Sequence, residues 1–260
     1  MYRHILLFTL LITFFNSSIL AEDQPRAYQS GEHLKYVIHY GLIRGGRASL
    51  SVKTEKLKDQ EVFHMVLTGR TVGLPNAIYR VKDTYESYVD PETSLPIKAI
   101  RNIREGRYRK YNELEFDHQN NTVKSKLSGV HEVPDNIQDI LSAFYFARQN
   151  LFTPSLKKGD IVVVQTYFAD ELFPLRIRFM GYETIRSRMG KIKCFKFVPV
   201  VITGRAFKNE DDMTIWISAD QNKLPIRVKF NLFIGSVKCD LVDYSGLANP
   251  LGSILKEAKE

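Results

Sequence analysis

Only two cysteines occur in the 260 residues, and no hydrophobic run is long enough to span a membrane as a helix. The longest uncharged apolar run, residues 5–15, falls well short of the roughly 20 residues that such a helix needs. Hydrophobic residues make up 44% of the chain and charged residues 25%, which are ordinary globular proportions and argue against disorder. The chain is therefore expected to fold around a sizeable core.

Sequence patterns typical of catalysis are also missing. There is no Gly-x-Ser-x-Gly turn, no phosphate-binding glycine loop and no His-Glu-x-x-His helix. A metal or catalytic cluster of histidines would need the fold to bring together residues from separate predicted strands and turns. These scattered residues are His33, His39, His64, His118 and His131. We therefore expect no catalytic residue, no metal site and no cofactor.

Neither Cys194 nor Cys239 has a histidine or a second cysteine at the spacing of metal ligands. They lie in two strand-like runs, residues 191–201 and 236–242. In an oxidising compartment they could form one disulfide, which would require the two strands to be neighbours. The alternative is that both are buried free thiols.

Residues 1–21 have the three-part pattern of a secretory signal peptide. Arg3 and His4 give a short basic head, the apolar run follows, and small residues lead to a cleavage site after Ala21. The pattern predicts an exported protein, located in the periplasm, whose residues 22–260 form a single β-rich domain without a transmembrane segment.

The formal net charge is +8, and loss of Arg3 with the leader gives 8 − 1 = +7 for the mature chain. An exported basic protein meets phospholipid head groups, lipopolysaccharide phosphates or acidic glycans, so we expect an envelope partner and not nucleic acid. The excess charge could instead only keep the protein soluble and its sheet edges unpaired.

Alternation of apolar and polar residues dominates the chain, which is the pattern of half-buried β-strands. It begins at residues 34–40 and resumes at 48–52, after a turn expected at Gly45 and Gly46. Further strand-like runs lie at 175–179, 213–217 and 226–232. Turns are expected at 58–60, 105–106, 117–121, 189–190, 209–212 and 234–235. The spacing predicts a mainly β fold, with a curved antiparallel sheet or open barrel.

Residues 135–152 have helical spacing instead. The apolar positions are Ile137, Ile140, Leu141, Phe144, Tyr145 and Leu151. Asp135 is the expected N-cap, and Gln138 could complete a capping box. The apolar stripe is wider than one flat contact surface requires, so this main helix is expected to pack in the concavity of the sheet.

Residues 72–79 form an apolar loop or short helix between two predicted strands. The segment could cover the mouth of a cavity, or it could be a buried crossover. We take Leu74 and Ile78 from this segment, with Phe144 and Phe173, as candidates for binding an apolar ligand.

One hairpin pattern occurs twice. Residues 88–98 read as an aromatic strand end, an acidic turn and a Leu-Pro start to the next strand, and residues 216–227 repeat it with one extra residue. The repeat suggests two pseudo-equivalent halves, about 30–130 and 155–246, around the helix at 135–152. Hairpins could also reuse the same turn chemistry by chance.

Arg101, Arg104, Arg107 and Arg109 form the best candidate patch for an anionic partner. In a strand, Arg107 and Arg109 project to one face and Lys110 to the other, so the basic charge is not confined to one face. A solvated hairpin that keeps other sheet edges away is the competing interpretation.

Several segments resemble a family of exported bacterial proteins of unknown function from Gram-negative envelopes. They cover residues 34–50, with the motif Tyr-Gly-Leu-Ile-Arg-Gly-Gly, residues 83–91, and residues 215–220 with 224–226. The most specific segment is Asp-Ile-Leu-Ser-Ala-Phe-Tyr-Phe-Ala-Arg at 139–148, whereas Arg47 replaces an acidic residue usual in the family. The resemblance implies export and a curved sheet on a helix, but no activity. The fold-level pattern is also similar to that of periplasmic lipoprotein carriers, whose half-barrels hold acyl chains.

The leading hypothesis is a non-enzymatic periplasmic or cell-envelope protein that binds a lipid-like or other apolar ligand, or an envelope partner, around the helix. If the helix fills the concavity, the protein would instead be a structural or interaction module. An envelope hydrolase acting on a glycan or lipid is the remaining alternative. It would need a cleft that unites two or more of Asp83, Glu86, Asp139, His39, His64 and Arg148.

Overall fold

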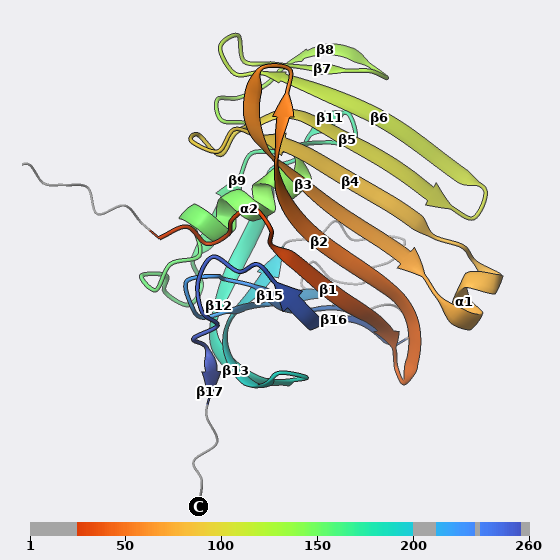
Figure 1. Cartoon of the computed structure of the whole chain (residues 1–260), viewed down its shortest axis with the longest axis vertical. Coiled ribbons are helices and arrows are strands. Elements are labelled where there is room, and N and C mark those ends of the chain that lie inside the picture. The colour runs from red at the N-terminus through yellow and green to blue at the C-terminus, as the bar shows by residue number, and fades with distance from the viewer. Residues whose placement is uncertain (1–24, 200–211, 232–234, 256–260) are drawn as a thin grey trace, which may run out of the picture.

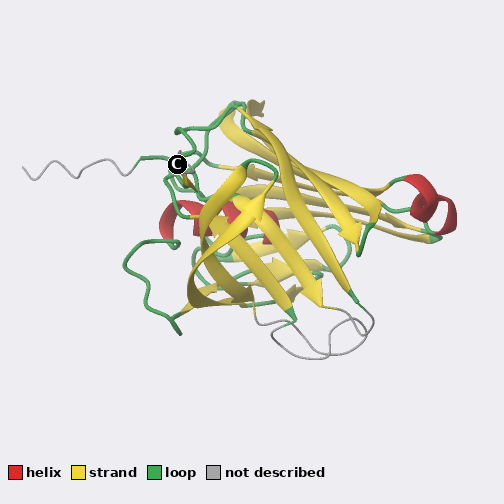
Figure 2. Ribbon diagram, turned by 90° about the horizontal axis from the view of Figure 1, so that it is seen from below, coloured by secondary structure: helices red, strands yellow, loops and turns green. Residues whose placement is uncertain are grey.

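The computed structural model describes residues 25–199, 212–231 and 235–255. The predicted signal peptide at 1–21 lies outside this range, as do residues 209–211 and 234 of two predicted turns. The described chain consists mainly of one antiparallel sheet that bends around a helix (Figures 1 and 2). The predicted fold class, a curved antiparallel sheet with the main helix in its concavity, is confirmed.

The N-terminal half of the sheet is a meander in which each strand pairs with the next one in the sequence. Its strands are β1 (His33–Tyr40), β2 (Ile43–Leu57), β3 (Gln60–Thr71), β4 (Lys82–Val89), β5 (Pro96–Glu105), β6 (Tyr108–Asp117), β7 (Thr122–Ser125) and β8 (Gly129–Glu132). The turns predicted around Lys58, Gly106 and Asn121 lie between strands, and all three residues have the positive φ that tight hairpins need. The short helix α1 (Gly73–Ile78) connects β3 to β4.

The C-terminal half contributes the rest of the sheet. Its strands are β9 (Ile161–Val164), β12 (Leu175–Ser187), β13 (Gly190–Pro199), β14 (Met213–Ser218), β15 (Pro225–Asn231), β16 (Ser236–Ser245) and β17 (Ile254–Leu255), which pairs with β13. Two further strands, β10 (Tyr167–Phe168) and β11 (Glu171–Leu172), form a separate hairpin.

The first and the last long strands join the two halves. β1 pairs with β16 in antiparallel register, from His33 opposite Ser245 to Tyr40 opposite Val237. The strand order therefore runs from β8 through β1 to β16 and on to β9, and these outer strands β8 and β9 do not pair with each other. The sheet is curved and stays open.

The main helix, α2 (Ile140–Asn150), begins later than the sequence indicates. Asp139, and not Asp135, is the N-cap, and Ser142 completes the capping box in place of Gln138. The expectation for Asp135 and Gln138 was wrong because Gln138 forms a parallel bridge with Thr166, which holds this part of the chain extended. No helix within the described ranges is long and apolar enough to cross a membrane.

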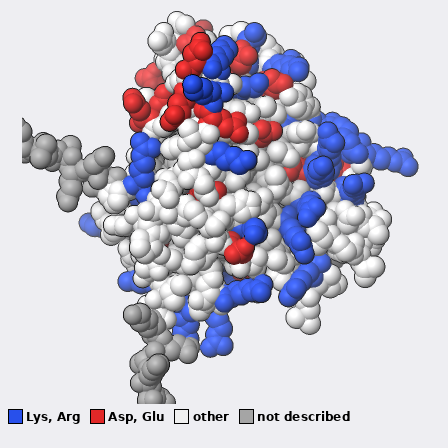
Figure 3. Space-filling view, in the orientation of Figure 1, with Lys and Arg blue, Asp and Glu red and all other residues white. Residues whose placement is uncertain are grey.

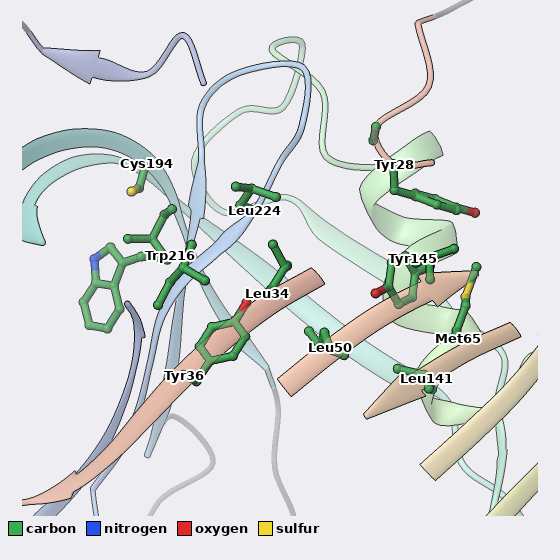
Figure 4. Packing of buried hydrophobic residues seen from close by; sticks show 14 of the residues in the cluster. Tyr28, Leu34, Tyr36, Leu50, Met65, Leu141, Tyr145, Cys194, Trp216 and Leu224 are labelled. Carbon is green, nitrogen blue, oxygen red and sulfur yellow. The ribbon is translucent and has the colours of Figure 1, made fainter. Parts of the chain in front are cut away.

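The main hydrophobic core lies between α2 and the inner face of the sheet (Figure 4). Leu141 and Tyr145 of the helix belong to the same buried cluster as Leu34 of β1, Leu50 of β2 and Met65 of β3. Burial of a large apolar side chain stabilises the fold by roughly 1.5–3 kcal/mol. This core fixes one side of α2 against the N-terminal half of the sheet.

The turn between β1 and β2 also differs from the prediction. It falls at Gly41 and Leu42, whereas Gly45 and Gly46 lie within β2. A Cβ atom on Gly46 would approach the carbonyl oxygen of Arg70 to 2.9 Å. The double glycine therefore permits close packing of the paired strands and does not reverse the chain.

The two hairpins that carry the repeated pattern, β4–β5 and β14–β15, have similar turns. Asp90 accepts hydrogen bonds from the backbone N–H groups two and three residues later, and Asp220 does the same. Ser94 and Lys223, each directly before a Leu-Pro pair, both have positive φ. The division of the whole chain into two equivalent halves stays a prediction.

Cys194 and Cys239 are free thiols. Cys194 lies on β13 and Cys239 on β16, and the strands β14 and β15 stand between them in the sheet. The disulfide alternative is therefore wrong, because it requires neighbouring strands. Burial raises the pKa of each thiol to about 12, so neither is a reactive thiolate at neutral pH.

Candidate functional site

An apolar cavity lies between α2, the β10–β11 hairpin and the inner face of β12, β13 and β14, with a volume of about 460 Å³. Its lining is aliphatic and aromatic except for one charged residue, Glu171, on the hairpin. The lining residues are Ile140, Phe144, Ala147, Phe152, Phe168, Ala169, Glu171, Phe173, Leu175, Ile177, Phe197, Pro199, Met213, Ile215 and Ile217. We refer to this space as the apolar cavity.

The sequence periodicity explains why these side chains converge. Ile140, Phe144 and Ala147 are spaced by four and three residues and so lie on one face of α2. Leu175 and Ile177 alternate along β12, and Met213, Ile215 and Ile217 alternate along β14, so each set faces one side of the sheet. The small side chain of Ala147 leaves space between the helix and the strands.

Only part of the predicted ligand site lines this cavity. Phe144 and Phe173 do. Leu74 and Ile78 lie on α1 with 81% and 87% of their surface exposed, at the far end of the molecule (Figure 2). The reason is that α1 connects β3 and β4 beyond the body of the sheet and has no buried residue. The structure therefore does not bring Leu74 and Ile78 to the cavity.

The hairpin that closes one side of the cavity has a strained turn. Its two central residues, Ala169 and Asp170, have φ values of 58° and 70°, although neither is glycine. Asp170 accepts hydrogen bonds from Asn112 and Ser125, and these contacts tie the turn to β6 and β7. Backbone strain of this kind persists where surrounding contacts over-determine it, often at binding sites. Sequence reasoning missed this hairpin because it has no glycine and only two residues in each strand.

A second, smaller compartment of about 30 Å³ adjoins the apolar cavity and shares Ile140, Phe168 and Ala169 with its lining. Its charged lining residues include Arg101, so we call it the Arg101 compartment. The guanidinium carbon of Arg101 lies 4.7 Å from the centre of the Phe168 ring. The Nε atom of Arg101 is buried without a hydrogen-bond partner.

The structure divides the predicted basic patch. Arg101 faces the interior, whereas Arg104, Arg107 and Arg109 are exposed on the outer surface of the β5–β6 hairpin. Within this hairpin, Arg104 lies opposite Arg109 on the neighbouring strand. The four arginines therefore form two separate features, one inside the sheet and one outside.

The residues proposed for a hydrolase do not meet in a cleft. His64 contacts Glu86 at 2.8 Å, but this pair lies on the outer side of β3 and β4, where His64 stacks on Tyr88. Asp139 caps α2, and the side chain of Arg148 pairs with Glu32 in the core. Asp83 and His39 lie elsewhere on the sheet, in β4 and β1. Within the described residues, no group of three His, Cys, Asp or Glu side chains could hold a metal ion.

Asp139 is a buried carboxyl group directly before the lining residue Ile140. Burial raises its pKa, although Ser87 and the backbone N–H groups of Leu141 and Ser142 donate hydrogen bonds that favour the charged form. All these contacts serve the start of α2 and its attachment to β4. The geometry thus explains Asp139 as a structural cap.

A family model described as "Protein of unknown function (DUF3108)" matches residues 35–242. The chain belongs to the DUF3108 family. The match extends from β1 to β16 and includes α2 and the residues around both compartments. It confirms the resemblance to a family of unknown function. A search of the curated proteins finds no match to this DUF3108 protein.

Solved structures show a similar fold. A β-barrel-like protein of the family DUF1849 from Brucella abortus superposes with a TM-score of 0.55 at 7% identity, covering 82% of this chain and 96% of that one. A DUF1089 family protein from Pseudomonas aeruginosa has a TM-score of 0.39 at 13% identity, covering 71% of this chain and 89% of the other. At such low identity the first match supports a shared β-barrel-like fold alone.

Proposed function

We propose that this DUF3108 protein is a non-enzymatic protein of the cell envelope that binds a lipid-like ligand in the apolar cavity. The observation that carries the proposal is a cavity of about 460 Å³ with a nearly uncharged lining. Ligand sites usually measure about 300–1,000 Å³ and are lined mainly by apolar side chains. Transfer of an acyl chain into such a site is favourable by about 0.8 kcal/mol for each buried CH₂ group.

The position of α2 supports a binding role over a filled core. One face of the helix packs into the main core through Leu141 and Tyr145, while Phe144 and Ala147 face the cavity. The helix therefore occupies the concavity only in part. Of the two possibilities left open by the sequence, a site with room for a ligand has the better support.

The location in the envelope rests on the sequence. Residues 1–21 have the pattern of a secretory signal peptide, and the resemblance described above implies export. An exported protein with an apolar cavity would meet free lipids and membrane surfaces in the same compartment. A hydrolase lacks comparable support, because His64 and Glu86 meet outside the cavity.

Native mass spectrometry of the full chain, expressed in a Gram-negative host and purified from the periplasm, tests both parts of the proposal. We expect a stoichiometric adduct that organic extraction removes and lipid analysis identifies. Ala147→Leu should reduce the adduct because it fills the cavity from α2. Val130→Leu, which also enlarges an aliphatic side chain but at an exposed position on β8, is the control.

A protein with a clean apo mass that also takes up no added lipid would overturn the binding proposal. Equal adducts in the Ala147→Leu and Val130→Leu variants would place any bound lipid outside the apolar cavity. Retention of the chain in the cytoplasm would overturn the envelope location.

A further inference from the structure

Arg101 lines its compartment without an ion pair to any residue that the structure describes, although the Glu105 carboxylate attracts it electrostatically. Lys110 lies 3.7 Å from the carboxylate of Asp170, and Asp170 also accepts hydrogen bonds from neighbouring side chains. The Asp139 carboxylate accepts hydrogen bonds from Ser87 and from the backbone N–H groups at the start of α2. Among the described residues, no carboxylate forms an ion pair with Arg101.

A partly buried guanidinium group is stable only when its charge and its N–H groups are compensated. The rings of Phe168 and Tyr85 lie 4.7 and 5.9 Å from the guanidinium carbon, and such contacts compensate the charge in part. The Nε–H group still has no acceptor. The site therefore has room for one more hydrogen-bond acceptor at Nε of Arg101.

The Phe168 side chain lies between Arg101 and the apolar cavity. Its ring contacts the guanidinium group of Arg101 and also lines the cavity, so the charge lies directly behind the cavity wall. We propose that the ligand is a fatty acid, whose carboxylate binds Arg101 while its chain occupies the apolar cavity. This inference rests on the proposed function and specifies its ligand class.

The size of the compartment favours a carboxylate over a larger head group. About 30 Å³ of space suits a group with few atoms, whereas a phosphodiester with a glycerol would not fit without rearrangement. A guanidinium group also binds carboxylates through charge-assisted hydrogen bonds, which are stronger than neutral ones.

Isothermal titration of the full chain with laurate and with dodecanol tests the inference, because the two probes share a chain and differ in charge. The wild-type protein should prefer laurate by about tenfold or more, as expected for a hydrogen bond to a charged group. Arg101→Met should remove this preference while leaving the affinity for dodecanol unchanged, and Arg101→Lys should retain part of it. Arg176→Met, at an exposed position on β12, should have no effect.

Equal affinity of the wild-type protein for laurate and dodecanol would overturn the fatty-acid inference but leave apolar binding intact. An unchanged laurate preference in a folded Arg101→Met variant would overturn it as well. Failure of the wild-type protein to bind either probe would overturn the proposed function itself. If Arg101→Met does not fold, the loss or retention of preference in Arg101→Lys decides the question.

A different observation, at the end of the molecule that carries α1, supports a second inference. Leu42, in the turn between β1 and β2, is fully exposed, and Leu74 and Ile78 of α1 are more than four-fifths exposed. The two segments are neighbours, because Val72 donates a hydrogen bond to the carbonyl oxygen of Gly45. Three large aliphatic side chains therefore project into solvent from one end of the sheet.

Basic residues surround these apolar side chains. The exposed ones on the neighbouring segments are Arg44, Arg47, Arg70, Arg80, Lys82, Arg104, Arg107 and Arg109. Acidic residues on the same segments are only Asp83 and Glu105, and neither is fully exposed. The space-filling view shows lysine and arginine gathered along this side, whereas aspartate and glutamate gather elsewhere (Figure 3). We call this end of the molecule the basic tip.

An anionic membrane surface complements both features of the basic tip. Exposed aliphatic side chains insert at the boundary of head groups and acyl chains, and each nearby lysine or arginine adds about 1 kcal/mol of attraction to anionic lipids. We infer that the basic tip docks on an anionic phospholipid bilayer, with Leu42, Leu74 and Ile78 inserted. This inference does not depend on a ligand in the apolar cavity.

Co-sedimentation of the full chain with vesicles tests the docking. We expect binding to phosphatidylglycerol vesicles, little binding to phosphatidylcholine vesicles, and weakening by salt. The triple variant Leu42→Ser, Leu74→Ser, Ile78→Ser should lose most of the binding. The matched control is Leu127→Ser, Val130→Ser, which changes exposed apolar residues at the opposite edge of the sheet, near β7 and β8.

Absence of wild-type binding to phosphatidylglycerol vesicles would overturn the docking inference. Equal binding by the triple variant and the control would overturn the assignment to the basic tip. Because every substituted residue is exposed, both variants should unfold at nearly the same temperature as the wild-type protein.

Discussion

The carboxylate of Glu32 accepts two hydrogen bonds of 2.8 Å from the guanidinium group of Arg148, and neither side chain is exposed. Arg148 also donates to the carbonyl oxygens of Ala27 and Asn222. Burial opposes the charge on Arg148, but the Glu32 carboxylate raises the pKa of Arg148 above its ordinary value. These bonds connect α2 to the segment before β1 and to the β14–β15 turn. The side chain of Arg148 thus connects both halves of the sheet to one helix.

Loss of this ion pair should strongly destabilise the folded protein. Arg148→Met should lower the free energy of unfolding by about 3–5 kcal/mol, because it leaves Glu32 as a buried charge without a partner. Chemical denaturation measures the change. The exposed pair Lys35–Asp243, also 2.8 Å apart, is the control, and Lys35→Met should cost less than about 1 kcal/mol. Similar losses in both variants would contradict the role assigned to Arg148.

The start of α2 provides a second test. Asp139→Ala should lower the free energy of unfolding by about 1–2 kcal/mol or more, because it removes the N-cap and leaves the Ser87 hydroxyl without its acceptor. Asp135→Ala should have a smaller effect, since Asp135 accepts a hydrogen bond from Asn121 and does not cap the helix. A larger loss for Asp135→Ala in urea denaturation would show that the helix begins earlier.

Asp170 should make the β10–β11 hairpin sensitive to acid. Burial raises the pKa of this carboxyl, but hydrogen bonds from Ser125, Ser128 and Asn112 outweigh it and lower the pKa below the ordinary value of 3.8. A lowered folded-state pKa gives stability above the unfolded-state value, and this stability is lost as the pH falls through the folded-state pKa. Asp170→Asn should therefore destabilise the protein near neutral pH and have a diminishing effect below about 3.8.

Urea denaturation of the wild-type protein and the Asp170→Asn variant across this pH range measures the difference. Hydrogen exchange of residues 166–173 shows whether the loss is local to the hairpin. A difference in stability that stays constant from neutral pH into strong acid would be inconsistent with ionised Asp170 as the source.

Close packing of β2 on β3 predicts different effects of alanine at two glycines. Gly46→Ala should destabilise the fold by about 1–3 kcal/mol, because the new Cβ atom would lie 2.9 Å from the Arg70 carbonyl oxygen and 3.2 Å from the Ile38 side chain. Gly69→Ala, on the facing strand, meets nothing within 4 Å and should be neutral or slightly stabilising. Thermal unfolding of the two variants measures the difference. Equal changes in unfolding temperature would argue against the close approach at Gly46.

The two cysteines should resist modification until the protein unfolds. Iodoacetamide should leave Cys194 and Cys239 unlabelled under native conditions and label both in denaturant, because burial raises both pKa values to about 12. A reductant should not change the unfolding temperature. An intact mass two hydrogens lower, restored by reduction, would contradict the free thiols.

Much of the fold could be predicted from the sequence because local periodicity reports which face of an element is buried. Alternation of apolar and polar residues predicted β1, β12, β14 and β15. Helical spacing predicted that Ile140 and Phe144 lie on the same face of α2. Phe173, named from the sequence as a candidate for ligand binding, lines the cavity. Lys58 and Asn121, both with positive φ, lie in hairpins that the turn chemistry of the sequence predicts.

Contacts between distant segments required the tertiary structure. The pairing of Gln138 with Thr166 decided that α2 begins after Asp139, and the strands between Cys194 and Cys239 excluded a disulfide. The same is true of Arg101, which the sequence grouped with its exposed neighbours and the fold directs to the interior.

The sequence by itself determined a curved β-sheet on one helix, the helix face available for a cavity, and the basic character of the chain. These features depend on side-chain patterns within single elements. Tertiary structure alone decided the partner of Arg148, the enclosure of the apolar cavity by the β10–β11 hairpin, and the exposure of Leu74 and Ile78 far from it. The physical reason is that burial and pairing across the sheet depend on which distant strands become neighbours, and no local pattern records that choice.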